Sequence, residues 1–61
     1  MRDPARIDEF CKELAELWKS EVPDWRFGQL ICNVFSTFTS DPFFIEDGRM
    51  IEKIKVYFEQ E

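Results

Sequence analysis

Histidine is absent from this 61-residue sequence, and cysteine and glycine occur only twice each. Without histidine the chain lacks the usual general base, the central residue of nucleophilic triads and the commonest zinc ligand. Cys11 and Cys32 are 21 positions apart, which is not a metal-binding spacing, and the sequence offers no evident base that could deprotonate either thiol. Gly28 and Gly48 do not make a glycine-rich phosphate loop. We therefore predict that the protein is not an enzyme and uses no metal or cofactor.

Long apolar runs are also missing from the chain. No stretch approaches the roughly 18 apolar residues of a membrane span, and the first residues lack the apolar centre of a signal peptide. Cys11 and Cys32 fall within apolar helical stripes, so we expect both thiols to be buried and reduced rather than joined. These features predict a cytoplasmic protein that does not bind membranes.

Positive charge is scarce, because 13 Asp and Glu residues outnumber 8 Lys and Arg and leave a net charge of −5. An acidic chain disfavours nonspecific binding to nucleic acid, and it favours either solubility or a basic protein partner. Aromatic residues are plentiful instead, with seven Phe, two Trp and one Tyr. A chain this short buries only about 60% of its unfolded surface. The aromatic side chains therefore supply the apolar surface for the core of one domain over residues 1–61. We expect some of this surface to be buried against a second copy of the chain.

Residues 5–21 show the periodicity of an amphipathic helix, with apolar side chains three or four positions apart. Asp3 is placed to cap this helix, with Pro4 at its first position. Pro23 then ends the helix near residue 21, because proline displaces the residue before it from the helical region. We predict that Asp24 caps a second helix over residues 25–38. The short joint predicts that the two helices form an antiparallel hairpin.

The second helix is unusual in its glycine and in its lack of charge. Gly28 should be compensated by the close approach of a backbone or of a ring such as Trp18, because glycine destabilises a helix interior by about 1 kcal/mol. Arg26 is the only charged residue of this segment, and we expect it to pair with Asp47 or Glu46. The polar positions, which include Gln29 and Asn33, carry no charge. They indicate a helix that is covered on more than one side or that meets a partner.

A turn over residues 39–42 follows, and then Phe43, Phe44 and Ile45 form a segment too short for a helix. We predict that these three residues fold onto the hairpin as an apolar plug. Asp47 then opens a third helix over residues 48–60. The predicted fold class is an all-α, compact three-helix domain: a helical hairpin, the plug and a third helix.

Two segments carry a resemblance to a known group of proteins. Residues 23–31 read P-D-W-R-F-G-Q-L-I, and residues 43–47 read F-F-I-E-D. With the surrounding helices this order resembles small uncharacterised proteins of bacteria and their phages, in which the pattern is P-D-x-R-F-G-Q-L-I followed by F-[YF]-I-E-D. The resemblance covers nearly the whole chain. It implies a small helical fold and a prokaryotic or phage origin, and it carries no activity.

Two binding motifs fit the sequence poorly. Residues 41–52 have the length of an EF-hand loop, but apolar residues stand where calcium needs oxygen ligands. A helix-turn-helix could use Arg49, Lys53 and Lys55 on the third helix. However, the second joint is too long for that motif and the chain is acidic. We treat a nucleic-acid-binding regulator as an unfavoured alternative.

One face of the first helix is acidic. Glu9, Glu13 and Glu16 are separated by about 4.5–6 Å along a helix that rises 1.5 Å per residue. This spacing is comparable to that of phosphates along a nucleic-acid strand, so the face could occupy a basic groove of a partner. The alternative is a solvated face whose carboxylates pair with Lys12 and Lys19.

These observations predict a non-enzymatic protein-interaction module, and a phage or mobile-element inhibitor of a host protein fits them best. The alternative is a small structural or regulatory protein that forms a homo-oligomer. The candidate surfaces are the acidic face and a second face that contains Gln29, Asn33, Phe43 and Phe44. We also predict a twofold dimer through the second helix and the plug, because interface cores are poor in charge and rich in aromatic residues.

Overall fold

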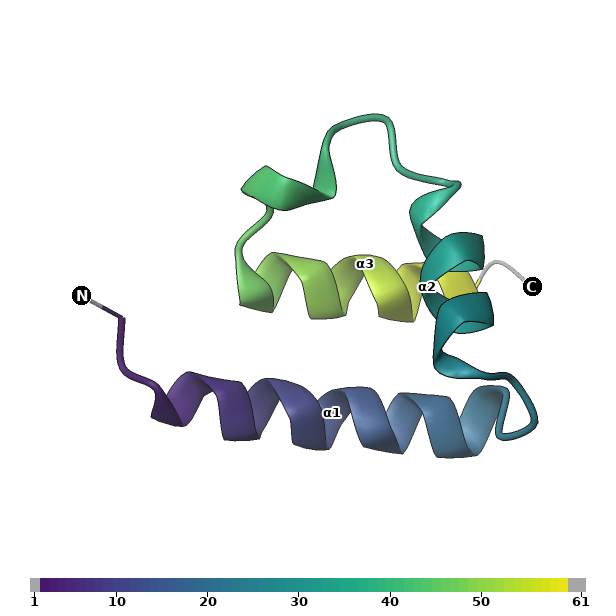
Figure 1. The fold of residues 1–61 in the computed structure, drawn as a ribbon, viewed down its shortest axis with the longest axis horizontal. Helices are drawn as coiled ribbons and strands as arrows, with labels where there is room; N and C mark the ends of the chain where they lie inside the picture. Colours follow the sequence, from purple (N-terminus) through teal and green to yellow (C-terminus); the bar gives the residue numbers. More distant parts are fainter. Residues whose placement is uncertain (1, 60–61) are drawn as a thin grey trace.

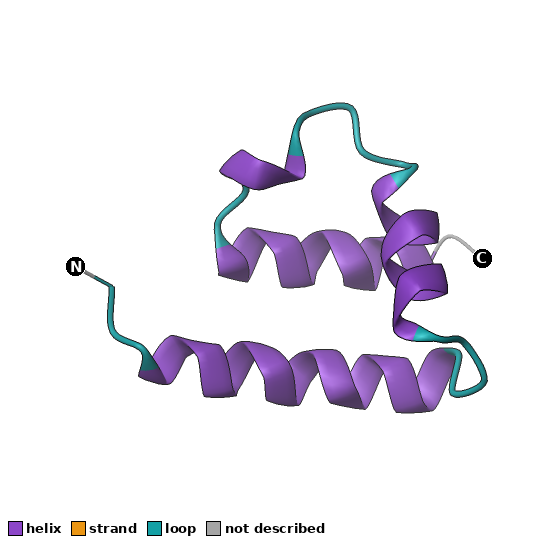
Figure 2. Cartoon of the chain, in the orientation of Figure 1, coloured by secondary structure: helices purple, strands orange, loops and turns teal. Residues whose placement is uncertain are grey.

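Four helical segments make up the computed structural model, which describes residues 2–59 (Figures 1 and 2). They are α1 (Ala5–Glu21), α2 (Phe27–Phe35), the short 3₁₀ helix η1 (Pro42–Phe44) and α3 (Asp47–Glu59). No β-strand occurs within the described residues. The structure confirms the predicted all-α, three-helix fold.

The bounds of α1 agree with the predicted ones, and the start of α3 differs from its predicted position by one residue. Asp3 accepts a hydrogen bond through Oδ1 from the backbone N–H of Ala5 at 3.0 Å, so its carboxylate caps the start of α1 as expected. The helix ends at Glu21, immediately before the Val22–Pro23 step. The third helix starts at residue 47 instead of 48, and the predicted end at residue 60 lies outside the described residues.

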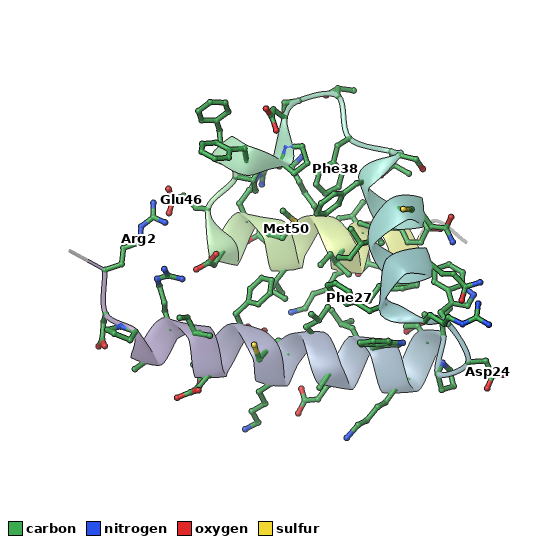
Figure 3. The ribbon with its side chains drawn as sticks, in the orientation of Figure 1. Arg2, Asp24, Phe27, Phe38, Glu46 and Met50 are labelled. Atoms are coloured by element: carbon green, nitrogen blue, oxygen red, sulfur yellow. The ribbon has the colours of Figure 1, made fainter. Side chains whose placement is uncertain are left out.

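The second helix is shorter than predicted at both ends, and Asp24 does not cap it. Pro23, Asp24 and Trp25 form a turn in which the Trp25 N–H donates to the Val22 carbonyl at 3.0 Å. Because this turn takes up the residues expected to be helical, α2 begins only at residue 27. Gln29 supplies the cap instead: its Oε1 accepts from the N–H of Arg26 at 2.7 Å. Asp24 lies at the outer end of the joint (Figure 3).

The helices do not form the predicted hairpin of α1 and α2. Instead α1 and α3 lie side by side and run in the same direction, and α2 crosses near their carboxyl ends (Figure 1). The joint between α1 and α2 spans residues 22–26, longer than the two or three residues expected. Trp18 fixes the turn of the chain there, because its indole Nε1 donates to the Trp25 carbonyl at 3.0 Å.

A small apolar core holds the three helices together. Within residues 2–59, the buried side chains are Leu30 and Val34 of α2 and Ile51 and Ile54 of α3. Partly buried residues of all three helices pack around this centre, Leu14, Leu17 and Trp18 of α1 among them. Aromatic pairs extend the packing: the Trp18 and Phe27 ring centroids lie 6.0 Å apart and those of Trp25 and Phe58 6.4 Å apart.

Two predictions about the second helix are wrong. A Cβ atom placed on Gly28 would meet no atom within 4 Å, so neither Trp18 nor another backbone approaches this glycine. Arg26 is exposed and forms no ion pair within the described residues. Its expected partners are taken by the segment before α1 and by the first turn of α1.

Arginines near the N-terminal end of the described chain pair with the acidic residues at the start of α3. Arg2 Nη2 lies 2.6 Å from Glu46 Oε2, and Arg6 pairs with Asp47. Figure 3 shows Arg2 and Glu46 pointing toward one another. The parallel course of α1 and α3 explains this outcome, because it brings the amino ends of both helices to the same end of the molecule (Figure 1).

The two cysteines are unpaired, as predicted, but both are exposed. The apolar stripes of α1 and α2 are wider than the faces that neighbouring helices cover, so Cys11 and Cys32 remain outside the contacts. The prediction of buried thiols is wrong for this reason.

Candidate functional site

The turn before α3 presents two phenylalanines to solvent. Asp41 organises it: Oδ1 accepts from the Phe43 N–H at 2.9 Å, and the Asp41 carbonyl accepts from the Phe44 N–H at 3.2 Å. Pro42 occupies the first position of η1, where its missing N–H is not needed. The rings of Phe43 and Phe44 pack edge to face with centroids 4.9 Å apart. The sequence Asp-Pro-Phe-Phe therefore builds a locally ordered aromatic pair.

These side chains do not form the predicted plug. Phe43 is 82% exposed and Phe44 76% exposed, while Ile45 and Pro42 are half-buried. A 3₁₀ turn has three residues per turn, so consecutive side chains point in directions about 120° apart. Three neighbouring residues of such a turn cannot all face the core. The prediction of an apolar plug over residues 43–45 is wrong for this geometric reason.

A groove of about 310 Å³ lies between the end of α2 and the outer side of α3. It is lined by Thr37, Phe38, Arg49, Glu52, Lys53, Val56 and Tyr57. Figure 3 shows Phe38 between α3 and the segment that follows α2. Lys53 Nζ lies 5.3 Å from the centroid of the Phe38 ring, a cation–π distance. Val56 is 46% exposed, so the groove offers apolar and aromatic surface beside positive charge.

The cations of α3 are engaged with their own chain. Arg49 Nη1 lies 3.1 Å from Glu52 Oε1, and Lys55 Nζ lies 3.6 Å from Glu13 Oε1. Lys53 stands over an aromatic ring, as described above. A helix that reads nucleic acid directs such cations to phosphates. Because these ion pairs are exposed and weak, the helix-turn-helix alternative stays a prediction that the acidic net charge disfavours.

The predicted acidic face of α1 is divided by one of these ion pairs. Glu9 and Glu16 are exposed, whereas Glu13 is turned toward Lys55 and is half-buried. A second hollow, of about 280 Å³, lies near the carboxyl ends of the same two helices. It is lined by Leu17, Glu21, Lys55, Phe58 and Glu59. The three glutamates thus do not offer one uninterrupted row of free carboxylates.

The uncharged side of α2 is exposed rather than covered by the rest of the chain. Gln29 and Asn33 both face solvent. Gln29 caps the helix, and the Asn33 carbonyl accepts from the Ser36 hydroxyl at 2.7 Å. The expectation that this side is covered within the domain is wrong, and its role in meeting a partner stays a prediction.

The groove is the feature that the sequence did not reveal. The predicted second helix over residues 25–38 includes Phe38, and the sequence singles out Lys53 only as a possible nucleic-acid contact on the third helix. Because α2 ends at Phe35, Phe38 turns back over α3 and meets Lys53. The Thr37–Phe38–Thr39–Ser40 sequence, which suits a turn, was the available signal.

The chemistry available at these surfaces is limited. No group of three or more His, Cys, Asp or Glu side chains in residues 2–59 is arranged to hold a metal ion. In the same part of the chain, no helix has both the length and the hydrophobicity needed to cross a lipid bilayer. The chain matches no protein-family model, no curated protein and no solved structure. We therefore infer the function from the chemistry of these surfaces.

Proposed function

We propose that this protein is a non-enzymatic interaction module that binds a protein partner through the surface formed by Phe43 and Phe44. The observation that carries the proposal is the exposure of both rings, 82% and 76%, in a chain that buries few side chains. Burying one large apolar side chain contributes about 1.5–3 kcal/mol. Exposed aromatic pairs of this kind supply the anchors of protein interfaces.

The build of the turn supports the same proposal. The Asp41 cap and Pro42 hold the backbone of η1, so the rings are presented without a partner to order them. An anchor that is already ordered loses little conformational entropy when it binds. The net charge of −5 favours a partner whose surface is basic, because long-range attraction speeds its association.

The inhibitor role and the phage or mobile-element origin rest on the sequence resemblance and the acidic surface, and both stay predictions. An inhibitor of a host protein would use the aromatic pair as its anchor in the same way. The cytoplasmic location likewise stays a prediction.

The test compares what tagged proteins bind in an extract of the source cell. The binding variant is Phe43→Ser/Phe44→Ser, and the matched control is Ile7→Ser, which removes another exposed apolar side chain, 48% exposed, from α1. Figure 1 shows α1 on the other side of α3 from η1. A specific partner should be recovered by the wild type and by the control, and lost by the double variant. Equal recovery by all three proteins would contradict the proposal.

Helicity measured by circular dichroism on the same samples checks that folding is retained. Both substitutions of the binding variant are at exposed positions outside the core, so the signal should match that of the wild type.

A further inference from the structure

The exposed turn and the groove have complementary chemistry. The turn carries two apolar rings next to the carboxylate of Asp41. The groove carries apolar and aromatic surface next to Arg49, Glu52 and Lys53, which together leave one net positive charge. No residue of the turn lines the groove of its own chain. Each copy of the protein therefore presents both halves of a contact and leaves both unfilled.

We propose that the groove receives the Asp41–Phe44 segment of a second copy of this chain. This inference rests on the proposed function, since it uses the same aromatic anchor and names the partner. A ring of the incoming turn packs against Val56 and the aromatic wall, and the Asp41 carboxylate faces Lys53 beside the Arg49–Glu52 ion pair. One Asp41 oxygen already accepts from the Phe43 N–H, and the carboxylate has further acceptor sites for an arginine or lysine.

The volume of the groove, about 310 Å³, falls at the lower end of the range of about 300–1,000 Å³ for small-molecule sites, so the charge of the groove and not its size selects the occupant. Two of its charges, Arg49 and Glu52, already neutralise each other, and Lys53 supplies the excess positive charge. An apolar segment that carries one carboxylate matches that balance.

Each copy carries a charge of −5, so the association is opposed by overall repulsion and should be weak.

The mode of contact differs from the twofold dimer through helix 2 predicted from the sequence. A turn in a groove joins two different surfaces, so it is a heterologous contact unless two such contacts close reciprocally. Because the turn and the groove are different surfaces, a substitution can disable one of them and leave the other intact.

The experiment is sedimentation equilibrium from micromolar to millimolar concentration on three samples besides the wild type. The turn variant is Phe43→Ser/Phe44→Ser. The groove variant is Val56→Glu, which places a carboxylate at an exposed position of the groove, with Lys53→Glu as a second groove variant if the first lacks native helicity. The third sample is an equimolar mixture of the turn and groove variants.

The wild type should exceed the monomer mass of 7.4 kDa as its concentration rises, and each variant alone should stay at 7.4 kDa or show at least about tenfold weaker association. The mixture should form a one-to-one complex, because the intact turn of the groove variant meets the intact groove of the turn variant. A mixture that stays monomeric would overturn the inference, as would a groove variant that associates like the wild type.

A wild type that is monomeric throughout would also overturn it. That result would leave the proposed function intact, because the extract experiment tests the aromatic anchor against a foreign partner.

Discussion

Replacing Trp18 with phenylalanine should destabilise the protein through the loss of one hydrogen bond at the joint. The indole Nε1 of Trp18 donates to the Trp25 carbonyl at 3.0 Å in a partly buried position. The variant leaves that carbonyl without its donor, and a typical intramolecular hydrogen bond contributes about 0.5–1.5 kcal/mol to stability. The smaller ring also loses part of its packing, including part of the contact with Phe27.

The expected loss is large relative to the stability of so small a domain. At about 0.05–0.15 kcal/mol per residue, the 61 residues yield a free energy of unfolding of roughly 3–9 kcal/mol. A loss of 1 kcal/mol lowers the melting temperature of a small domain by about 4–8 °C. Thermal and urea unfolding followed by circular dichroism resolves a change of that size.

The matched control is Trp25→Phe. This substitution also replaces a partly buried indole with a smaller ring, but it keeps the Trp25 carbonyl and its hydrogen bond from Trp18. The Trp25 indole donates no hydrogen bond to any residue from 2 to 59, so this variant loses packing alone. Trp18→Phe should be less stable than the control by about 1 kcal/mol. Equal unfolding midpoints for the two variants would refute the claim that this hydrogen bond stabilises the joint.

Two further predictions concern the start of α2. Gln29→Ala should lower the free energy of unfolding by about 0.5–1 kcal/mol, because it removes the cap on the Arg26 N–H, whereas Asp24→Ala should change it by less than about 0.5 kcal/mol. Urea midpoints that rank the two variants the other way would restore Asp24 as the cap. Gly28→Ala should raise the free energy of unfolding by about 0.5 kcal/mol, since a Cβ there meets no atom within 4 Å and Gly28 has no positive φ. A lower urea midpoint for Gly28→Ala would show that this helix requires its glycine.

Local signals predicted the bounds of α1. The apolar spacing of α1 and the Asp3–Pro4 start depend only on neighbouring residues, so the predicted bounds of α1 were correct. The start of α2 was wrong because Asp24 fits a turn as well as a cap. Which of these it forms depends on the distant Trp18 side chain, whose indole binds the joint.

Contacts between helices were harder to predict from the sequence than the helices themselves. A helical stripe shows which side of a helix is buried but not which helix covers it, so the pairing of α1 with α3 was missed. The partners of Glu46 and Asp47 were wrong for the same reason, because Arg2 and Arg6 reach them only through that pairing. The sequence singled out Phe43 and Phe44 but predicted that they face the core. A three-residue turn is too short to show a periodicity that would indicate which side chains are exposed.

The parallel pairing of α1 and α3 has a consequence for folding kinetics. Its contacts join residues far apart in the chain: Arg6 and Asp47, for example, are separated by 41 positions. Closing a loop of that length has an entropy cost that must be met before the contacts form. Ile51 and Ile54, two of the four side chains that are buried within residues 2–59, belong to α3, so α1 and α2 alone would lack half of the buried core. We therefore expect the three helices to fold in a single cooperative step, more slowly than a bundle of hairpins of the same size.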